Sequence, residues 1–160
     1  MSRKLVTYFS ASGVTAKIAQ QLSEAIGADL HEISPEISYS NADLDWRNPE
    51  SRSSKEMKDK SFRPPIINDR INMDMYSTVF IGFPIWWYVA PTIINTFLEK
   101  YDFSGKKIVV FATSGGSGFG NTVEELKVSI TDNARIIEGK ILNGTYTNNE
   151  LSKWVDSLKI

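Results

Sequence analysis

Cysteine is absent from the 160 residues of this chain, and histidine occurs only once. Without cysteine there are no disulfides, no thiol catalysis and no cysteine-ligated iron–sulfur clusters. The single histidine, His31, lies on the polar side of a short stretch in which apolar and polar residues alternate. A metal site is not expected, because no second histidine is available to share the ligation, and we interpret His31 as a surface residue.

An excess of either charge and long apolar runs are also missing. Lysine and arginine number 18 and aspartate and glutamate 19, so neither nucleic acid nor a membrane is an expected partner. The apolar run after Lys4 is too short for a secretory signal, and no stretch has transmembrane length. We therefore expect a cytoplasmic protein whose residues 1–160 form one domain with a full-sized core.

Short apolar runs alternate with helical patterns along the chain. Strands are expected over 5–9, 29–33, 78–83, 107–112 and 134–139, the last extending toward 142, and helices over 14–26, 49–61, 91–101, 122–130 and 147–158. This alternation predicts a parallel sheet with helices on both faces. We predict a doubly wound α/β fold with five strands in the order 2-1-3-4-5.

In that strand order, the loops after the first, third and fourth strands meet at one crevice. The first loop holds Ser10, Ser12, Gly13 and Thr15, just before the first helix. Its hydroxyls and backbone N–H groups suit an anion, most plausibly a phosphate, at the positive end of the helix dipole. The alternative is a simple helix N-cap, for which a single hydroxyl would suffice.

The other two loops differ sharply in composition. Residues 84–89 read Pro-Ile-Trp-Trp-Tyr-Val, which offers a planar apolar slot, or else a cover for the core or an oligomer contact. Residues 113–120 contain four glycines, whose backbone groups could read the polar edge of a heterocycle, unless the loop is merely flexible. A phosphate site, a flat slot and a heterocycle edge together describe flavin mononucleotide, FMN.

These motifs resemble those of the flavodoxin family. Ser10-Ala-Ser-Gly-Val-Thr15 is similar to its phosphate loop, Phe83-Pro-Ile-Trp-Trp87 to its aromatic loop, and Thr113-Ser-Gly-Gly-Ser-Gly118 to its third flavin loop. The resemblance covers nearly the whole chain, is weakest over 36–75, and implies a flavodoxin-like fold with FMN as cofactor. It implies cofactor contacts from Ser10, Ser12, Gly13, Val14 and Thr15 at the phosphate, and from Pro84, Ile85, Trp86, Trp87, Tyr88, Thr113, Ser114, Gly115, Gly116, Gly118 and Phe119 around the ring.

Two functions fit this resemblance. The first is an FMN-dependent oxidoreductase that passes electrons from a reduced nicotinamide to a quinone-like or nitroaromatic acceptor. The alternative is a one-electron carrier between redox partner proteins, although such carriers tend to be more acidic than a net charge of −1. A phosphoacceptor signalling domain would need acidic residues where Phe9-Ser10 and Phe83-Pro84 stand. No catalytic acid or base is assigned, because the flavin itself performs the redox chemistry.

The aromatic loop favours the enzyme over the carrier. Carriers of this family flip a peptide in this loop on reduction, and glycine makes the flip easy because it tolerates positive φ. Residues 85–89 contain no glycine, and Tyr88 stands where many relatives have one. We therefore expect the loop to resist positive φ and electrons to move in pairs.

The stretch from residue 34 to residue 75 is the least regular part of the chain. A charged helix is expected near 49–61, where Asn48-Pro49 looks like an N-cap followed by proline at the first helical position. Its charged face could form a basic patch, but we interpret the helix as solvated. Tyr39 and Trp46 precede it, and either fold over a ligand or anchor the loop to the core.

Overall fold

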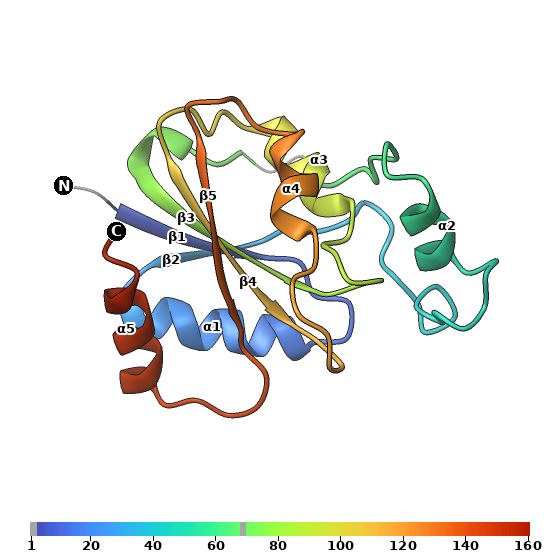
Figure 1. The fold of residues 1–160 in the computed structure, drawn as a ribbon, viewed down its shortest axis with the longest axis horizontal. Helices are drawn as coiled ribbons and strands as arrows, with labels where there is room; N and C mark the ends of the chain where they lie inside the picture. The colour runs from blue at the N-terminus through green and yellow to red at the C-terminus, as the bar shows by residue number, and fades with distance from the viewer. Residues whose placement is uncertain (1–2, 68–69) are drawn as a thin grey trace.

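The fold was analysed in a computed structural model, which describes residues 3–67 and 70–160 (Figure 1). Its strands are β1 (Arg3–Tyr8), β2 (Asp29–Glu32), β3 (Tyr76–Pro84), β4 (Lys107–Thr113) and β5 (Arg135–Ile141). Its helices are α1 (Val14–Ile26), α2 (Arg52–Lys58), α3 (Ile93–Lys100), α4 (Thr122–Lys127) and α5 (Asn148–Ser157), with a 3₁₀ turn, η1, at Met73–Met75. In these described residues the strands form one parallel sheet in the order β2-β1-β3-β4-β5, which confirms the predicted topology.

Alternate side chains of the central strands feed two apolar layers. Val6, Phe80 and Val109 pack against α1 and α5 on one face of the sheet. The neighbouring residues on each strand, such as Leu5, pack with residues of α3 and α4 on the other face. Figure 1 shows α1 and α5 on one side of the sheet and α3 and α4 on the other. Successive strand residues point to opposite faces, so the near-continuous apolar runs of β1, β3 and β4 reflect burial on both sides.

Helix α2 lies outside these two layers, beyond the carboxyl ends of the strands (Figure 1). It is shorter than predicted, because Ser51 rather than Asn48 is its N-cap and accepts the Ser54 N–H with its hydroxyl. Asn48 instead accepts the Glu50 N–H at 2.9 Å in a turn before the helix, a local bond that competes with helix formation. The helix is also less solvated than predicted, since Glu56 is buried.

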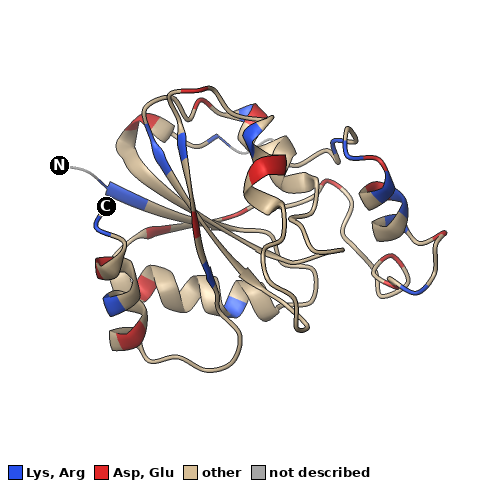
Figure 2. Cartoon of the chain, in the orientation of Figure 1, with Lys and Arg blue, Asp and Glu red and all other residues tan. Residues whose placement is uncertain are grey.

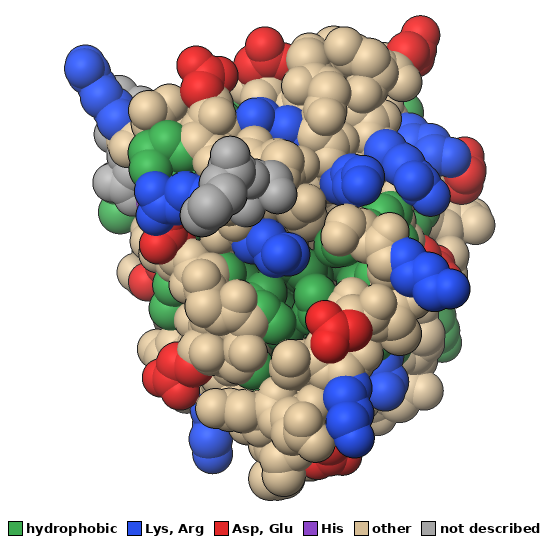
Figure 3. Space-filling view, turned by 90° about the vertical axis from the view of Figure 1, so that its left-hand side faces the viewer, with side chains coloured by type: hydrophobic (Ala, Val, Ile, Leu, Met, Phe, Trp, Pro, Cys, Tyr) green, Lys and Arg blue, Asp and Glu red, His purple; other side chains and the backbone are tan. Residues whose placement is uncertain are grey.

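The opposite end of the molecule carries the start of β1 and the C-terminus (Figure 1). Figure 3 views this end, where hydrophobic side chains gather in a central patch ringed by charged ones. His31 lies in edge strand β2 and is half-buried, with its ring stacked on Phe97 at 6.4 Å between centroids, so it is not the plain surface residue predicted. Over the described ranges, no helix is both long and apolar enough to cross a bilayer.

Candidate functional site

The hydroxyl loop enters α1 without capping it. Gly13 is the N-cap, at φ 94°, and makes no side-chain capping bond in the described structure. Ser10 accepts the Gly13 N–H at 3.1 Å with its hydroxyl, which tightens the loop before the helix begins. The N-cap interpretation of the three hydroxyls is therefore wrong, and the first helical turn faces outward with its donors and its positive dipole end.

Thr15 connects the hydroxyl loop to the end of β4. It is 2% exposed, and its Oγ1 lies 2.7 Å from the Oγ1 of Thr113. Ser12 and Val14 are exposed beside it. The buried pair fixes the phosphate loop relative to the glycine loop that follows Thr113, although the two lie 98 residues apart in the chain.

The aromatic loop is a tight two-residue turn. Trp86 and Val89 exchange backbone hydrogen bonds of 2.9 and 3.1 Å, and the residues between them, Trp87 and Tyr88, have φ of 48° and 69°. Positive φ at both central positions is the pattern of a type I′ turn, which normally selects asparagine and glycine. The expectation that bulky side chains keep this turn out of positive φ is wrong, and two aromatic residues hold a strained backbone here.

Three rings underlie this turn. Phe9, Tyr39 and Trp86 meet edge to face, with centroids 5.5 to 5.7 Å apart. Such pairs add to the stabilisation that burial already provides, so Trp86 is anchored to the core. Trp87 and Tyr88 remain 42% and 70% exposed at the rim.

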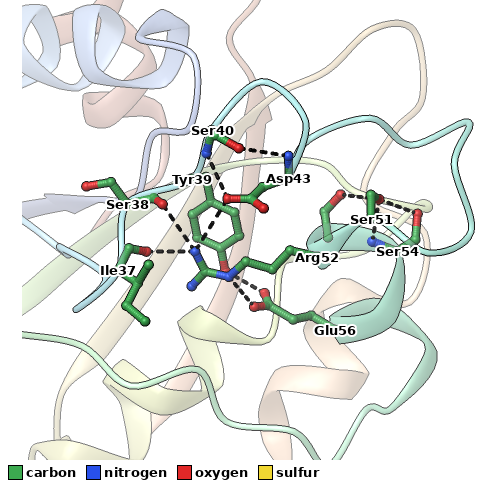
Figure 4. Close-up of polar contacts among 10 residues, drawn as sticks. Ile37, Ser38, Tyr39, Ser40, Asp43, Ser51, Arg52, Ser54 and Glu56 are labelled. Atoms are coloured by element: carbon green, nitrogen blue, oxygen red, sulfur yellow. Dashed lines mark hydrogen bonds and ion pairs between the residues drawn. The ribbon is translucent and has the colours of Figure 1, made fainter.

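Tyr39 is an anchor rather than a cover, and an ionic cluster on α2 holds it in place (Figure 4). Its hydroxyl donates to the carboxylate of Glu56, and the Arg52 guanidinium lies 3.8 Å over its ring. Arg52 also donates to Glu56 at 2.9 Å and to the Ile37 carbonyl at 2.7 Å. Burial, followed by the hydrogen bond to Glu56, raises the pKa of Tyr39 far above its ordinary value, so the phenol stays neutral.

The glycine loop has its own internal frame. The Ser114 hydroxyl accepts the N–H groups of Gly116 and Ser117, at 3.1 and 2.8 Å. The Asn143 side chain then brackets the Ser114 backbone, accepting its N–H at 2.9 Å and donating to its carbonyl at 2.8 Å. Sequence reasoning missed Asn143, although its position directly after the fifth strand places it at the same edge of the sheet.

Two glycines of this loop are not explained by the protein's own packing. A methyl group on Gly115 or Gly118 would meet no atom within 4 Å, and neither residue has the positive φ that favours glycine. Gly120 is the opposite case, because a methyl group there would overlap the Tyr88 carbonyl oxygen. Gly120 therefore serves the fold, whereas Gly115 and Gly118 leave the backbone bare toward open space.

These elements enclose a cleft of about 700 Å³ at the carboxyl ends of the strands. Its walls are Leu44, Trp46, Ser53, Ile85, Trp86, Trp87, Tyr88, Gly115, Gly116 and Ser117. Trp46, 69% exposed, belongs to the segment that sequence reasoning left open, and it covers the cleft while Tyr39 anchors the core. The volume suits a small-molecule ligand, and the mixture of aromatic wall and bare backbone suits a flat ring with a polar edge.

Most of the predicted site residues are brought together. Six of them line the cleft, and Pro84 and Thr113 are paired in register where β3 and β4 end. The loop of Ser10 to Thr15 lies next to Thr113 through the Thr15 hydroxyl. Phe119 belongs to the core instead, where it is 8% exposed and packs with residues of α3 and α4.

Among solved structures, two from Bacteroides match this chain over almost its full length. A candidate flavoprotein from Bacteroides eggerthii is 46% identical, with a TM-score of 0.92, and covers 100% of this chain and 99% of its own. A second, from Bacteroides uniformis, is 42% identical with a TM-score of 0.90, covering 97% and 98%. A flavoprotein from Lactobacillus acidophilus in complex with FMN is 23% identical, with a TM-score of 0.69, covers 97% and 99%, and shares the fold.

No curated protein matches the chain. The Flavodoxin family model matches residues 3–158, which includes all three loops and the segment of Trp46. The predicted family resemblance is thereby confirmed, and the chain belongs to the flavodoxin family.

Proposed function

We propose that this protein binds FMN in the cleft and works as an oxidoreductase, passing electrons from NADH or NADPH to a quinone-like or nitroaromatic acceptor. Gly115, a bare glycine that lines the cleft, carries the cofactor assignment, and Gly118 lies three residues further along the same loop. Glycine at these positions satisfies neither packing nor backbone angle, but it allows a ligand to approach the backbone closely. The FMN bound by the Lactobacillus acidophilus relative supports the same cofactor.

The phosphate of FMN would lie at the N-terminus of α1. The backbone N–H groups of the first turn point there, and the exposed Ser12 hydroxyl is free to turn toward an anion. Thr15 holds the helix start against Thr113, so phosphate and ring are bound by loops of fixed relative position. The uncapped helix end supplies the positive electrostatic potential that a dianionic phosphate needs.

The ring would lie between the aromatic turn and the glycine loop. Trp86 is held by Phe9 and Tyr39, and Trp46 forms part of the wall of the cleft. Backbone groups of residues 115–117 face the same space and suit the polar edge of the ring. FMN bound there would supply the redox chemistry between a reduced nicotinamide and the acceptor.

No residue of the chain changes its oxidation state in the overall reaction. The nicotinamide loses a hydride, the solvent provides one proton, and a quinone gains two electrons and two protons to become a quinol. The chain's contribution is to bind, orient and shield. The mixed surface charges in Figure 2, and a net charge of −1, support small molecules rather than a basic protein as the redox partner.

One observation favours the second candidate, a one-electron carrier. Trp87 and Tyr88 already have positive φ, so the turn adopts left-handed backbone without glycine. A steric barrier to positive φ therefore no longer argues against a carrier, and direct measurement has to separate the two functions.

The test is anaerobic titration of the purified, FMN-loaded protein with NADH and with NADPH, followed by flavin absorbance. An oxidoreductase is bleached by one of them and recovers its colour when a quinone or nitroaromatic compound is added. A carrier resists both nucleotides but is reduced by light and then reduces a redox protein. Colourless protein with no FMN binding by calorimetry would refute the cofactor assignment itself.

A further inference from the structure

A second hollow adjoins the cleft and shares two tryptophans with it. It has a volume of about 280 Å³ and lies between α2 and the aromatic turn. Its lining consists of Trp46, Arg47, Pro49, Ser54, Met57, Lys58, Lys60, Trp87 and Val89, so that Trp46 and Trp87 are shared with the cleft. A cavity of roughly 150 Å³ accommodates one benzene ring, so this hollow suits one substituted aromatic group and is too small for a dinucleotide.

The lining of this hollow combines apolar and aromatic side chains with three positively charged ones. Two indoles, a thioether, a proline and a valine provide the apolar surface, and Arg47, Lys58 and Lys60 provide positive charge. None of the residues that line it is acidic. An aromatic ring is therefore favoured by stacking and by burial, and an anionic substituent by the three cations.

Four acidic residues near α2, Asp43, Glu50, Glu56 and Asp59, line a separate hollow together with Arg52, Lys55 and Phe62. Asp59 accepts the Ser61 hydroxyl at 2.6 Å and the Ser61 N–H at 3.1 Å. The two hollows beside the short helix therefore differ in lining, since Arg52 and Lys55 share the separate one with four acids, and Figure 2 shows Lys and Arg residues along the helix.

The three cations differ in how far protein carboxylates neutralise them. Lys60 is paired with Glu125, and Arg47 lies 3.6 Å from Asp45. Lys58 donates to the Pro49 carbonyl at 3.3 Å, and over residues 3–67 and 70–160 no carboxylate is within ion-pair distance of it. Lys58 is therefore the cation best able to bind an external anion.

We propose that this hollow binds a planar aromatic acceptor that carries an anionic group, such as a quinone with a sulfonate or carboxylate. The ring packs between Trp46 and Trp87, and the anionic group faces Lys58. The inference rests on the proposed function, since it assigns the class of acceptor that the cleft serves. Trp46 and Trp87 then contact both the cofactor space and the acceptor.

The test uses redox-inert probes, so that binding is measured separately from turnover. Naphthalene-2-sulfonate and its neutral analogue naphthalene-2-sulfonamide are titrated into the FMN-loaded protein by calorimetry. The sulfonate should bind more tightly, and Lys58→Gln should weaken it about two- to fivefold without affecting the sulfonamide. Higher salt should reduce the difference in affinity between the two probes, because the cations that line the hollow are exposed.

Lys55→Gln is the matched control, since Lys55 lies on the same helix but faces Glu50 at 3.4 Å in the acidic hollow. It should change neither probe's affinity, whereas Trp46→Ala should weaken both probes. Equal binding of the two probes, or equal effects of Lys58→Gln and Lys55→Gln, would overturn the inference. Adenosine 2′,5′-diphosphate that competes with the sulfonate would overturn the assignment to an acceptor, because the hollow would then serve the nucleotide donor.

Turnover separates this inference from the proposed function. Suppose that NADH or NADPH drives reduction of an uncharged quinone, but the sulfonate probe binds no more tightly than the sulfonamide. The proposed oxidoreductase function would then stand, and only the assignment of the hollow as an acceptor site would be overturned. Tight, Lys58-dependent sulfonate binding in a protein that neither nucleotide reduces would support the hollow and refute the oxidoreductase.

Discussion

The two walls of the cleft are built on opposite principles. The aromatic turn presents large side chains on strained backbone, with Trp87 and Tyr88 at positive φ. The glycine loop presents bare backbone, and Gly115 and Gly118 have no internal need to be glycine. The turn therefore lacks glycine where the backbone angle favours it, whereas Gly115 and Gly118 are glycines where the angle does not require one.

This difference shows that the residues of both walls serve a ligand more than they serve the local fold. A turn selected for stability would carry asparagine and glycine, and a loop selected for stability would carry alanine. A flat ring bound between them explains both departures, because it needs an apolar surface on one side and a close approach to backbone groups on the other. Strain of this kind is found where surrounding structure holds it in place, and the anchored Trp86 does so here.

Gly120→Ala should have the largest effect, because Gly120 is where the two walls touch. Its added methyl group would overlap the Tyr88 carbonyl oxygen, and its φ of 52° disfavours any side chain. We expect a loss of about 3 kcal/mol in the free energy of unfolding, measured by urea denaturation of the apoprotein. An unchanged midpoint would mean that the aromatic turn moves away freely, and the two walls would then be independent.

Thr15→Ala should come next, since it removes the bond that joins the phosphate loop to the foot of the glycine wall. The Thr113 hydroxyl would be left buried without its partner, which costs about 1–3 kcal/mol of unfolding free energy. FMN affinity should fall about ten- to a hundredfold, whereas riboflavin, which lacks the phosphate, should bind almost as before. Equal weakening of both ligands in calorimetry would contradict the phosphate assignment.

Replacing the strained turn by Trp87→Asn together with Tyr88→Gly should make the apoprotein more stable. The new pair suits a type I′ turn, and relief of left-handed strain should add about 1–2 kcal/mol to the free energy of unfolding. FMN affinity should fall, because the apolar wall loses Trp87. A less stable double variant would show that packing of the two rings outweighs the backbone strain, and the contrast between the walls would be weaker than described.

Gly115→Ala should have the smallest effect on the fold, because Gly115 has no neighbour within 4 Å of an added methyl group. The free energy of unfolding should stay the same or rise by about 0.5–1 kcal/mol, because alanine reduces the entropy of the unfolded chain. FMN affinity should nevertheless fall about tenfold, since the methyl group enters the space of the ring. If FMN binds the variant as tightly as the parent, Gly115 does not contact the cofactor and the central observation for the proposed function fails.

Much of the fold and of the site was predictable because its signals are local. Strand and helix periodicities within 5–33 and 78–158 define four of the βα units, and the three loops follow directly from where strands end. The start of the second helix was predicted too early, because Asn48 forms its own turn and Ser51 is the N-cap. Neighbouring side chains compete here for the same role. The stretch around Trp46 could not be placed, because its position depends on contacts with residues far away in the chain.

By itself, the sequence determined the doubly wound parallel sheet, the meeting of three loops at one edge, and the flavodoxin family. These depend on short-range patterns of apolar residues, hydroxyls and glycines. Only the tertiary structure decided the left-handed aromatic turn and the hydrogen bonds of Asn143 to the Ser114 backbone. It also decided that Tyr39 packs on the core while Trp46 lines the cleft. Each of these features arises from contacts between segments far apart in the chain, such as those of Tyr39 with Phe9 and Trp86. Packing of this kind can override the conformational preference of the local sequence.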